Sequence, residues 1–162
     1  MNIRNRIVSL LKENARLSYG DLAAMVGISE DEATREVHSL EDEGIIRGYT
    51  AIVSEDKLCA DNVEAFIEVK VTPKADCGFD EIARTIMMYD EVKDLTLMSG
   101  AFDLAVTISG TNYKEIALFV ARKLSTIDGV ISTATHFTLK NYKLKGFFLE
   151  DSKVDERGFV SP

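Results

Sequence analysis

Side chains that could act as metal ligands, bases or nucleophiles are few in this sequence. It contains two cysteines, Cys59 and Cys77, and two histidines, His38 and His136. A structural zinc site needs four ligands close together, and a disulfide framework needs more than two cysteines. The two histidines also fall in what we expect to be different domains. We therefore predict two reduced thiols, no metal site, no cofactor and no enzymatic activity.

The charge balance limits the partners that this chain can bind. Its 162 residues include 27 acidic and 19 basic side chains, a net charge of −8. Affinity for DNA depends on Lys and Arg displacing counterions from phosphates, so a local basic patch or an oligomer with several weak heads would have to compensate. No apolar run reaches the roughly 18 residues of a membrane span, and the N-terminus does not resemble a signal peptide. We expect a soluble, cytoplasmic protein.

Three short helices are predicted at the N-terminal end. The first has one apolar face and ends at Asn14; the face is formed by Ile3, Ile7, Leu10 and Leu11. Ser18 can cap a second helix, and Gly27 can stop it in a left-handed conformation. Ser29 and Glu32 fit a capping box for the third helix, which Gly44 closes. The tight turn indicates a helix-turn-helix, with the β-rich residues 45–53 as its wing; the alternative is a plain three-helix bundle without DNA contact.

A second domain follows a polar hinge. Residues 63–71 alternate between apolar and polar as in a strand with one buried face, and residues 79–86 return to helical spacing. Two further strands join at Gly100, whose backbone tolerates positive φ, and a helix and a final strand follow. This βαββαβ order predicts an α+β, ferredoxin-like fold with both helices on one face of an antiparallel sheet. The expected divisions are 1–53 (winged helix-turn-helix), 54–62 (hinge), 63–150 (βαββαβ domain) and 151–162 (tail).

Several stretches together resemble the Lrp/AsnC, or feast/famine, transcriptional regulators over essentially the whole chain. The matching stretches are residues 10–18, 22–29, 40–49, 99–104 and 128–135. The resemblance implies binding to double-stranded DNA as a dimer, with dimers formed through the sheets of the second domain and often gathered into octamers or larger assemblies. It also implies an amino acid or related small-molecule effector bound between dimers. Assembly also agrees with the expected fold, because the open sheet face and strand edges would otherwise leave apolar surface uncovered.

The resemblance places the effector site near the turn at residues 100–103 and on the final strand. The candidate residues are Gly100, Phe102, Asp103, Thr133 and Thr135. Backbone amides at Gly100 can meet a carboxylate, Asp103 can meet an ammonium group, and threonine hydroxyls can serve either. The alternative is structural: Gly100 forms the turn, Asp103 caps it, and the threonines are ordinary strand residues.

The third helix departs from the family by its acidity. Residues 29–43 hold seven acids against the single Arg35, and family members often have basic residues where Glu36 and Ser39 stand. The acids of the first turn favour the helix dipole. The DNA-binding candidates are Ser18, Tyr19, Thr34, Arg35, His38 and Ser39. Arg35 is the first choice, although it could instead pair with Asp31 one turn earlier.

Two other functions stay open from the sequence. Siroheme decarboxylases resemble this architecture, but the second domain offers only His136, Arg84 and Arg122 for such chemistry. A metabolite-binding or assembly module with weak or lost DNA binding would explain the acidic helix. The basic run at residues 140–145 is either a nucleic-acid surface or the solvated end of the last strand. Salt-dependent DNA binding would separate the module from a regulator.

Overall fold

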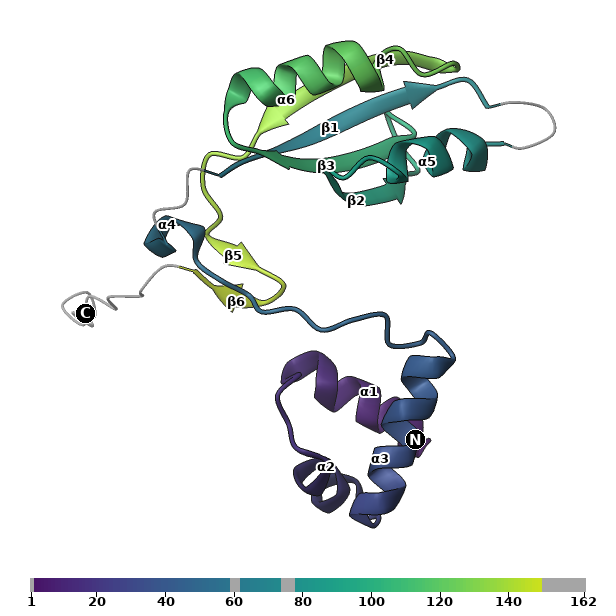
Figure 1. Ribbon diagram of the computed structural model, residues 1–162, viewed down its shortest axis with the longest axis vertical. Coiled ribbons are helices and arrows are strands. Elements are labelled where there is room, and N and C mark those ends of the chain that lie inside the picture. Colours follow the sequence, from purple (N-terminus) through teal and green to yellow (C-terminus); the bar gives the residue numbers. More distant parts are fainter. Residues whose placement is uncertain (1, 59–61, 74–77, 150–162) are drawn as a thin grey trace, which may run out of the picture. The chain divides into compact units, whose positions relative to one another are not determined.

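The structure is a computed structural model that describes residues 2–58, 62–73 and 78–149 (Figure 1). Cys59, Cys77, part of the expected hinge and the expected tail lie outside the described residues. The chain divides after Ile52 into two compact units, here called unit 1 and unit 2. Among the described residues, no helix is long and apolar enough to cross a membrane.

Unit 1 contains the three predicted helices. They are α1 (Ile3–Glu13), α2 (Tyr19–Val26) and α3 (Glu30–Asp42). Gly27 (φ +82°) and Gly44 (φ +67°) end α2 and α3 in the left-handed conformation, which glycine adopts without a Cβ penalty. The helices bury one apolar face each, and the core comprises Ile7, Leu11, Leu22, Ala23, Ala33, Val37 and Leu40.

The complete capping box lies at α2 and not at α3. Ser29 Oγ accepts the Glu32 amide at 3.3 Å, but no described bond returns from the Ser29 amide to Glu32. At α2, Ser18 Oγ accepts the Asp21 amide at 3.1 Å, and the Ser18 amide donates to Asp21 Oδ2 at 3.3 Å. At α2, the aspartate at the third helical position therefore makes the reciprocal bond that the sequence predicted for Glu32 at α3.

The strand expected in residues 45–53 is absent. The Ile45 and Ile46 amides both donate to the Leu40 carbonyl, at 2.9 and 3.0 Å, so this segment begins as the C-terminal cap of α3. A strand needs a hydrogen-bonded neighbour, and the rest of unit 1 is helices and turns, without an edge for pairing. In the single chain, the segment after α3 is therefore unpaired and has no regular secondary structure.

Unit 2 has the predicted βαββαβ order. Its main elements are β1 (Val63–Val71), α5 (Asp80–Met87), β2 (Val92–Leu97), β3 (Leu104–Gly110), α6 (Tyr113–Phe119), the π-helical turn η1 (Val120–Leu124) and β4 (Val130–Phe137). The antiparallel sheet has the order β2-β3-β1-β4, and α5 and α6 lie on the same face (Figure 1). A one-turn helix, α4 (Glu55–Leu58), stands within the expected hinge.

The two faces of the sheet differ. Alternate residues of β1 point to the helices and are buried: Ala65, Ile67, Val69 and Val71. Phe66, Glu68 and their strand neighbours Thr107 and His136 lie on the opposite, open face. The core of unit 2 therefore lies between the sheet and its helices, and the open face is not covered by any described element.

A short hairpin follows β4 in place of the expected solvated strand end. It is formed by β5 (Lys143–Leu144) and β6 (Phe147–Phe148). Lys145 (φ 46°) and Gly146 (φ 95°) form its two-residue turn, and positive φ at both positions is typical of the type I′ turn that suits hairpins. Lys-Gly is a weaker signal for this turn than Asn-Gly, so the sequence pattern did not indicate it.

Candidate nucleic-acid interface and effector site

Tyr19 and His38 bring the two helices of the helix-turn-helix together. The Tyr19 hydroxyl lies 3.3 Å from His38 Nε2, and the rings meet edge to face with centroids 6.0 Å apart. Ser18, the residue before Tyr19, is occupied in the α2 capping box. Two DNA-binding candidates therefore form one surface across α2 and α3, and a third supports it.

Arg35 differs from the other polar candidates of α3 by its lack of a partner. Thr34 Oγ1 donates to the Glu30 carbonyl at 2.9 Å, and Ser39 Oγ donates to Glu43 Oε1 at 2.7 Å. Arg35 is exposed and makes no hydrogen bond or ion pair with any described residue. The alternative pairing with Asp31 is thus not formed, and the guanidinium is available to a phosphate or a base edge.

Part of the acidity of α3 is neutralised by α1. Arg4 Nη2 lies 2.8 Å from Glu43 Oε1, and Arg4 Nε lies 3.7 Å from Glu36 Oε2. The hydrogen bond from Arg4, followed by that from Ser39, lowers the pKa of Glu43. The same pair raises the pKa of Arg4. The negative charge that an approaching DNA backbone would meet is therefore smaller than the count of acids indicates.

Tyr49 and Glu41 form a contact that the sequence analysis missed. The Tyr49 hydroxyl donates to Glu41 Oε1 at 2.7 Å. Partial burial first, and then this bond and the negative charge of Glu41, raise the pKa of Tyr49 to about 12. Tyr49 therefore ties the segment after α3 back onto α3. No local pattern could indicate the contact, because it depends on how the chain leaves the turn at Gly44.

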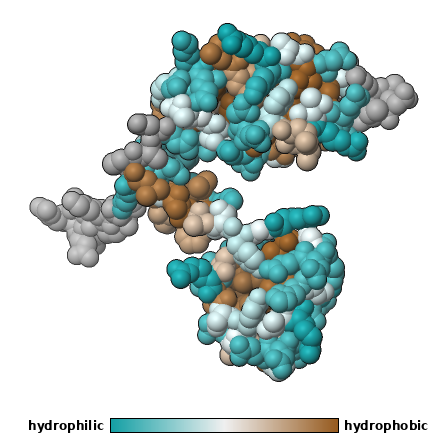
Figure 2. Space-filling model, in the orientation of Figure 1, coloured by the Kyte–Doolittle hydropathy of each residue, from teal (hydrophilic) through white to brown (hydrophobic). Residues whose placement is uncertain are grey.

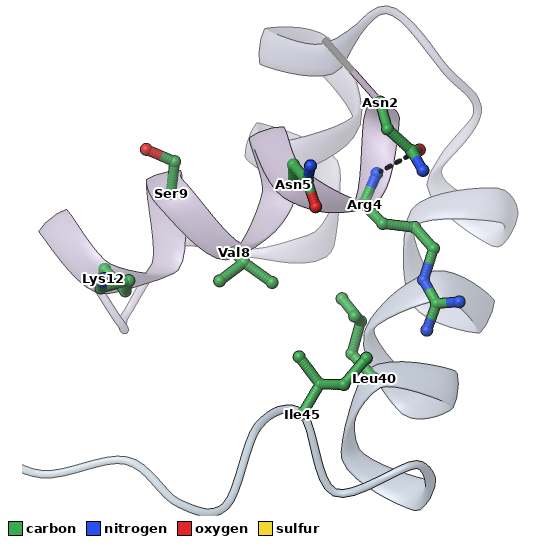
Figure 3. A pocket seen from close by; sticks show the side chains of 8 residues that line it. All are labelled: Asn2, Arg4, Asn5, Val8, Ser9, Lys12, Leu40 and Ile45. Atoms are coloured by element: carbon green, nitrogen blue, oxygen red, sulfur yellow. Dashed lines mark hydrogen bonds between the residues drawn. The ribbon is translucent and has the colours of Figure 1, made fainter.

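A shallow groove on unit 1 lies apart from these candidates (Figure 3). It has a volume of about 430 Å³ and is lined by Asn2, Arg4, Asn5, Val8, Ser9, Lys12, Leu40 and Ile45. A second groove, of about 400 Å³ on unit 2, is lined by Phe79, Asp80, Ala83, Met87, Val92, Lys93, Leu95, Leu97 and Leu104. Neither groove contains a predicted effector residue.

Asp103 has a structural bond in the expected effector turn. Its Oδ2 accepts the Val71 amide at 2.9 Å, and its own amide donates to the Val69 carbonyl at 3.1 Å. The side chain thus extends the β1–β3 pairing to the residue that precedes β3. Its Oδ1 has no bond to a described residue. Gly100 does not adopt positive φ, and a Cβ there would meet open space.

The remaining effector candidates lie on different faces of the sheet. The Phe102 ring packs edge to face on Phe66 of the open face, with centroids 6.0 Å apart. Thr133 and Thr135 pair with Val69 and Ile67, on the helix-covered face, and Thr133 Oγ1 lies 3.3 Å from Ser125 Oγ. One chain therefore does not gather the five candidates into one pocket.

The residues required by an enzymatic alternative are also separated. His136 lies on the open face, with Nε2 3.4 Å from Glu68 Oε1. Arg84 and Arg122 are exposed on α5 and η1, which lie on the other face. Within the described ranges, no group of three His, Cys, Asp or Glu side chains could hold a metal ion.

Known proteins match both units. A family model described as the Lrp/AsnC ligand binding domain matches residues 64–146, and one described as winged helix-turn-helix DNA-binding matches residues 2–47. The HTH-type transcriptional regulator YugG of Bacillus subtilis is 43% identical over 96% of this chain and 95% of its own length. The proline dehydrogenase transcriptional activator of Rhizobium radiobacter is 27% identical over 87% of this chain and 90% of its own length.

A solved structure of a transcriptional regulator has a similar fold. The transcriptional regulator NMB0573 of Neisseria meningitidis, in complex with L-Met, superposes with a TM-score of 0.68 and 27% identity, over 89% of this chain and 92% of its own. The fold and these matches define a DNA-binding transcriptional regulator with a ligand-binding domain. The chain belongs to the Lrp/AsnC family.

Proposed function

We propose that this regulator binds double-stranded DNA through α2 and α3 and responds to an amino acid or a related small metabolite. The observation that carries the DNA-binding part is Arg35, an exposed guanidinium on the second helix of the helix-turn-helix, without a partner among the described residues. Tyr19 and His38 lie beside each other on the same two helices. A regulator of this kind works on the chromosome, and we expect it in the cytoplasm and without enzymatic activity.

The effector class is supported by two relatives. One is named a proline dehydrogenase transcriptional activator, and another was solved in complex with L-Met. The Oδ1 atom of Asp103 could accept an ammonium group, while its Oδ2 holds the Val71 amide. The backbone at Gly100 is open to a carboxylate.

We propose that the chain acts as a dimer or a larger oligomer. The candidate residues lie on a loop and on both faces of one sheet, so a second copy would have to complete the effector site. The open face of unit 2 also presents Phe66 and His136 without a covering element among the described residues. We retain 1–53 as the DNA-binding domain and 63–150 as the effector and assembly domain.

A DNA titration tests this function. The full chain is titrated against the upstream region of its own gene and an unrelated duplex, at two salt concentrations, with and without a pool of amino acids. We expect preferential, salt-sensitive binding to the upstream fragment that changes with the pool. Salt-sensitive binding without preference or response would instead favour the module with weak or lost DNA binding.

Arg35→Ala sharpens the test. Removal of a base or phosphate contact made by a side chain of this kind is expected to cost about 1–3 kcal/mol, or roughly 5- to 150-fold in affinity. Arg84→Ala is the matched control, because it removes the same charge from an exposed position on α5 of unit 2. Equal affinities for the two variants would remove Arg35 from the interface.

A further inference from the structure

The hairpin β5–β6 lies in a stretch of the chain that has basic but no acidic side chains. Residues 138–149 contain Lys140, Lys143 and Lys145 and no acid; acidic residues resume at Glu150. The first 50 residues, by contrast, hold six basic and nine acidic side chains. The helix-turn-helix region therefore has a net charge of −3, whereas the hairpin stretch has a net charge of +3 that can add to DNA affinity.

The pairing of the hairpin sorts its side chains onto two faces. Lys143 pairs with Phe148, and Leu144 pairs with Phe147. Lys143 Nζ lies 4.7 Å from the centroid of the Phe148 ring, a cation–π contact that orders the lysine stem while the ammonium group faces solvent. Lys145 stands at the tip of the turn. Both lysines are exposed, so both can reach a phosphate.

The hairpin also exposes apolar side chains. Phe148 is 76% exposed and Phe147 is 51% exposed, and hydrophobic residues gather over this part of the molecule in Figure 2. A two-stranded hairpin by itself is at best marginally stable in water. This surface is therefore suited to contact with another molecule, and its positive charge favours a polyanion as that molecule.

We propose that the β5–β6 hairpin is a second DNA-binding element, which contacts phosphates through Lys143 and Lys145. A two-stranded ribbon fits the major groove of B-DNA, and its lysines add affinity that does not depend on sequence. The inference rests on the proposed function, because α2 and α3 must bring the protein to DNA. It assigns sequence preference to Arg35 and part of the salt-dependent affinity to the hairpin.

The test compares two double variants of the full chain. Lys143→Gln/Lys145→Gln removes the charge of the hairpin, and Lys93→Gln/Lys114→Gln removes the same charge elsewhere in unit 2. Binding to the upstream and the unrelated duplex is measured as a function of salt concentration. The slope of log K against log[salt] is expected to fall in magnitude by about 0.9 for each phosphate that the hairpin variant can no longer neutralise. It should stay at the wild-type value in the control, and the decrease should be equal for both duplexes.

Equal slopes for the hairpin variant and the wild type overturn the proposal. The proposal is also overturned if the hairpin variant changes the assembled mass, measured by light scattering, but not the slope. The hairpin would then contact a second copy of this chain. A hairpin effect without preference for the upstream fragment would support the second element and contradict the proposed function. If Arg35→Ala abolishes the preference for the upstream fragment while the hairpin variant keeps the wild-type slope, the proposed function is supported and the hairpin proposal is overturned. Absence of binding at every salt concentration overturns both.

Discussion

The two candidate sites of this protein are built in different ways. The six DNA-binding candidates come from a short stretch, residues 18–39, and several of their contacts are within one helical turn, as between Thr34 and Glu30. The five effector candidates come from a loop and from both faces of a sheet. Within each helix, periodicity decides which residues share a surface, and the contact between Tyr19 and His38 joins the surfaces of α2 and α3. In a sheet, the register with distant strands decides it.

The cores show the same contrast. Unit 1 packs short helices that are capped by their own flanking residues, such as Ser18 and Ser29. Unit 2 packs around β1, whose neighbours β3 and β4 come much later in the chain. If the two units are as independent as this contrast indicates, each should lose stability separately.

The largest expected effect is on the two cores. Leu40 and Ile67 are 1% and 0% exposed in units 1 and 2, and truncation to alanine at such positions costs about 2–5 kcal/mol. We expect Leu40→Ala to destabilise unit 1 and Ile67→Ala to destabilise unit 2, measured by amide hydrogen exchange in each unit during denaturation. If either variant destabilised both units equally, the two would form one cooperative unit.

Two variants of Asp103 test whether its side chain is structural or also binds the effector. Asp103→Ala leaves the buried Val71 amide without its acceptor, at a cost of about 1–3 kcal/mol. Asp103→Asn keeps an accepting oxygen and removes the charge. We expect the asparagine variant to unfold like the wild type but to bind amino acids more weakly by calorimetry. Undiminished amino-acid binding by the asparagine variant would leave Asp103 with the structural role alone.

Glycine-to-alanine variants at two turns are expected to have a smaller effect on stability. Gly27 has φ +82° and Gly100 has no positive φ, and a Cβ at either position would meet nothing within 4 Å. Gly27→Ala should therefore cost about 1–2 kcal/mol through backbone strain alone, whereas Gly100→Ala should not change the thermal midpoint. A large decrease in the midpoint at Gly100 would mean that its turn is more constrained than its geometry indicates.

The smallest effect expected is on the pH dependence of unit 1. Arg4 lowers the pKa of Glu43 in the folded chain, so this pair contributes stability above the unfolded pKa of glutamate. The contribution is lost as the pH falls through the folded pKa. Glu43→Gln should be less stable than the wild type at neutral pH, and the difference should vanish in acid. Glu13→Gln, at the exposed end of α1, is the control for the change in charge.

Local patterns alone predicted much of the fold. The bounds of β1 agree with the residue alternation, and Asn14, Ser18, Gly27 and Gly44 mark helix ends as their chemistry indicates. The family and the βαββαβ order are confirmed by the matched domains and the sheet. Such features depend on residues within one or two turns or on period-two spacing, which the sequence contains directly.

Other features were decided only by tertiary structure. Residues 45–53 have strand composition but no neighbour for pairing, so they form no strand in the single chain. Asp103 binds the Val71 amide because β3 begins at Leu104, opposite Val69, while β1 continues to Val71. Thr133 and Thr135 lie under the helices because their register with β1 puts them opposite Val69 and Ile67. Each outcome depends on a partner distant in sequence, so composition and spacing determine which element forms, and only packing determines what that element faces.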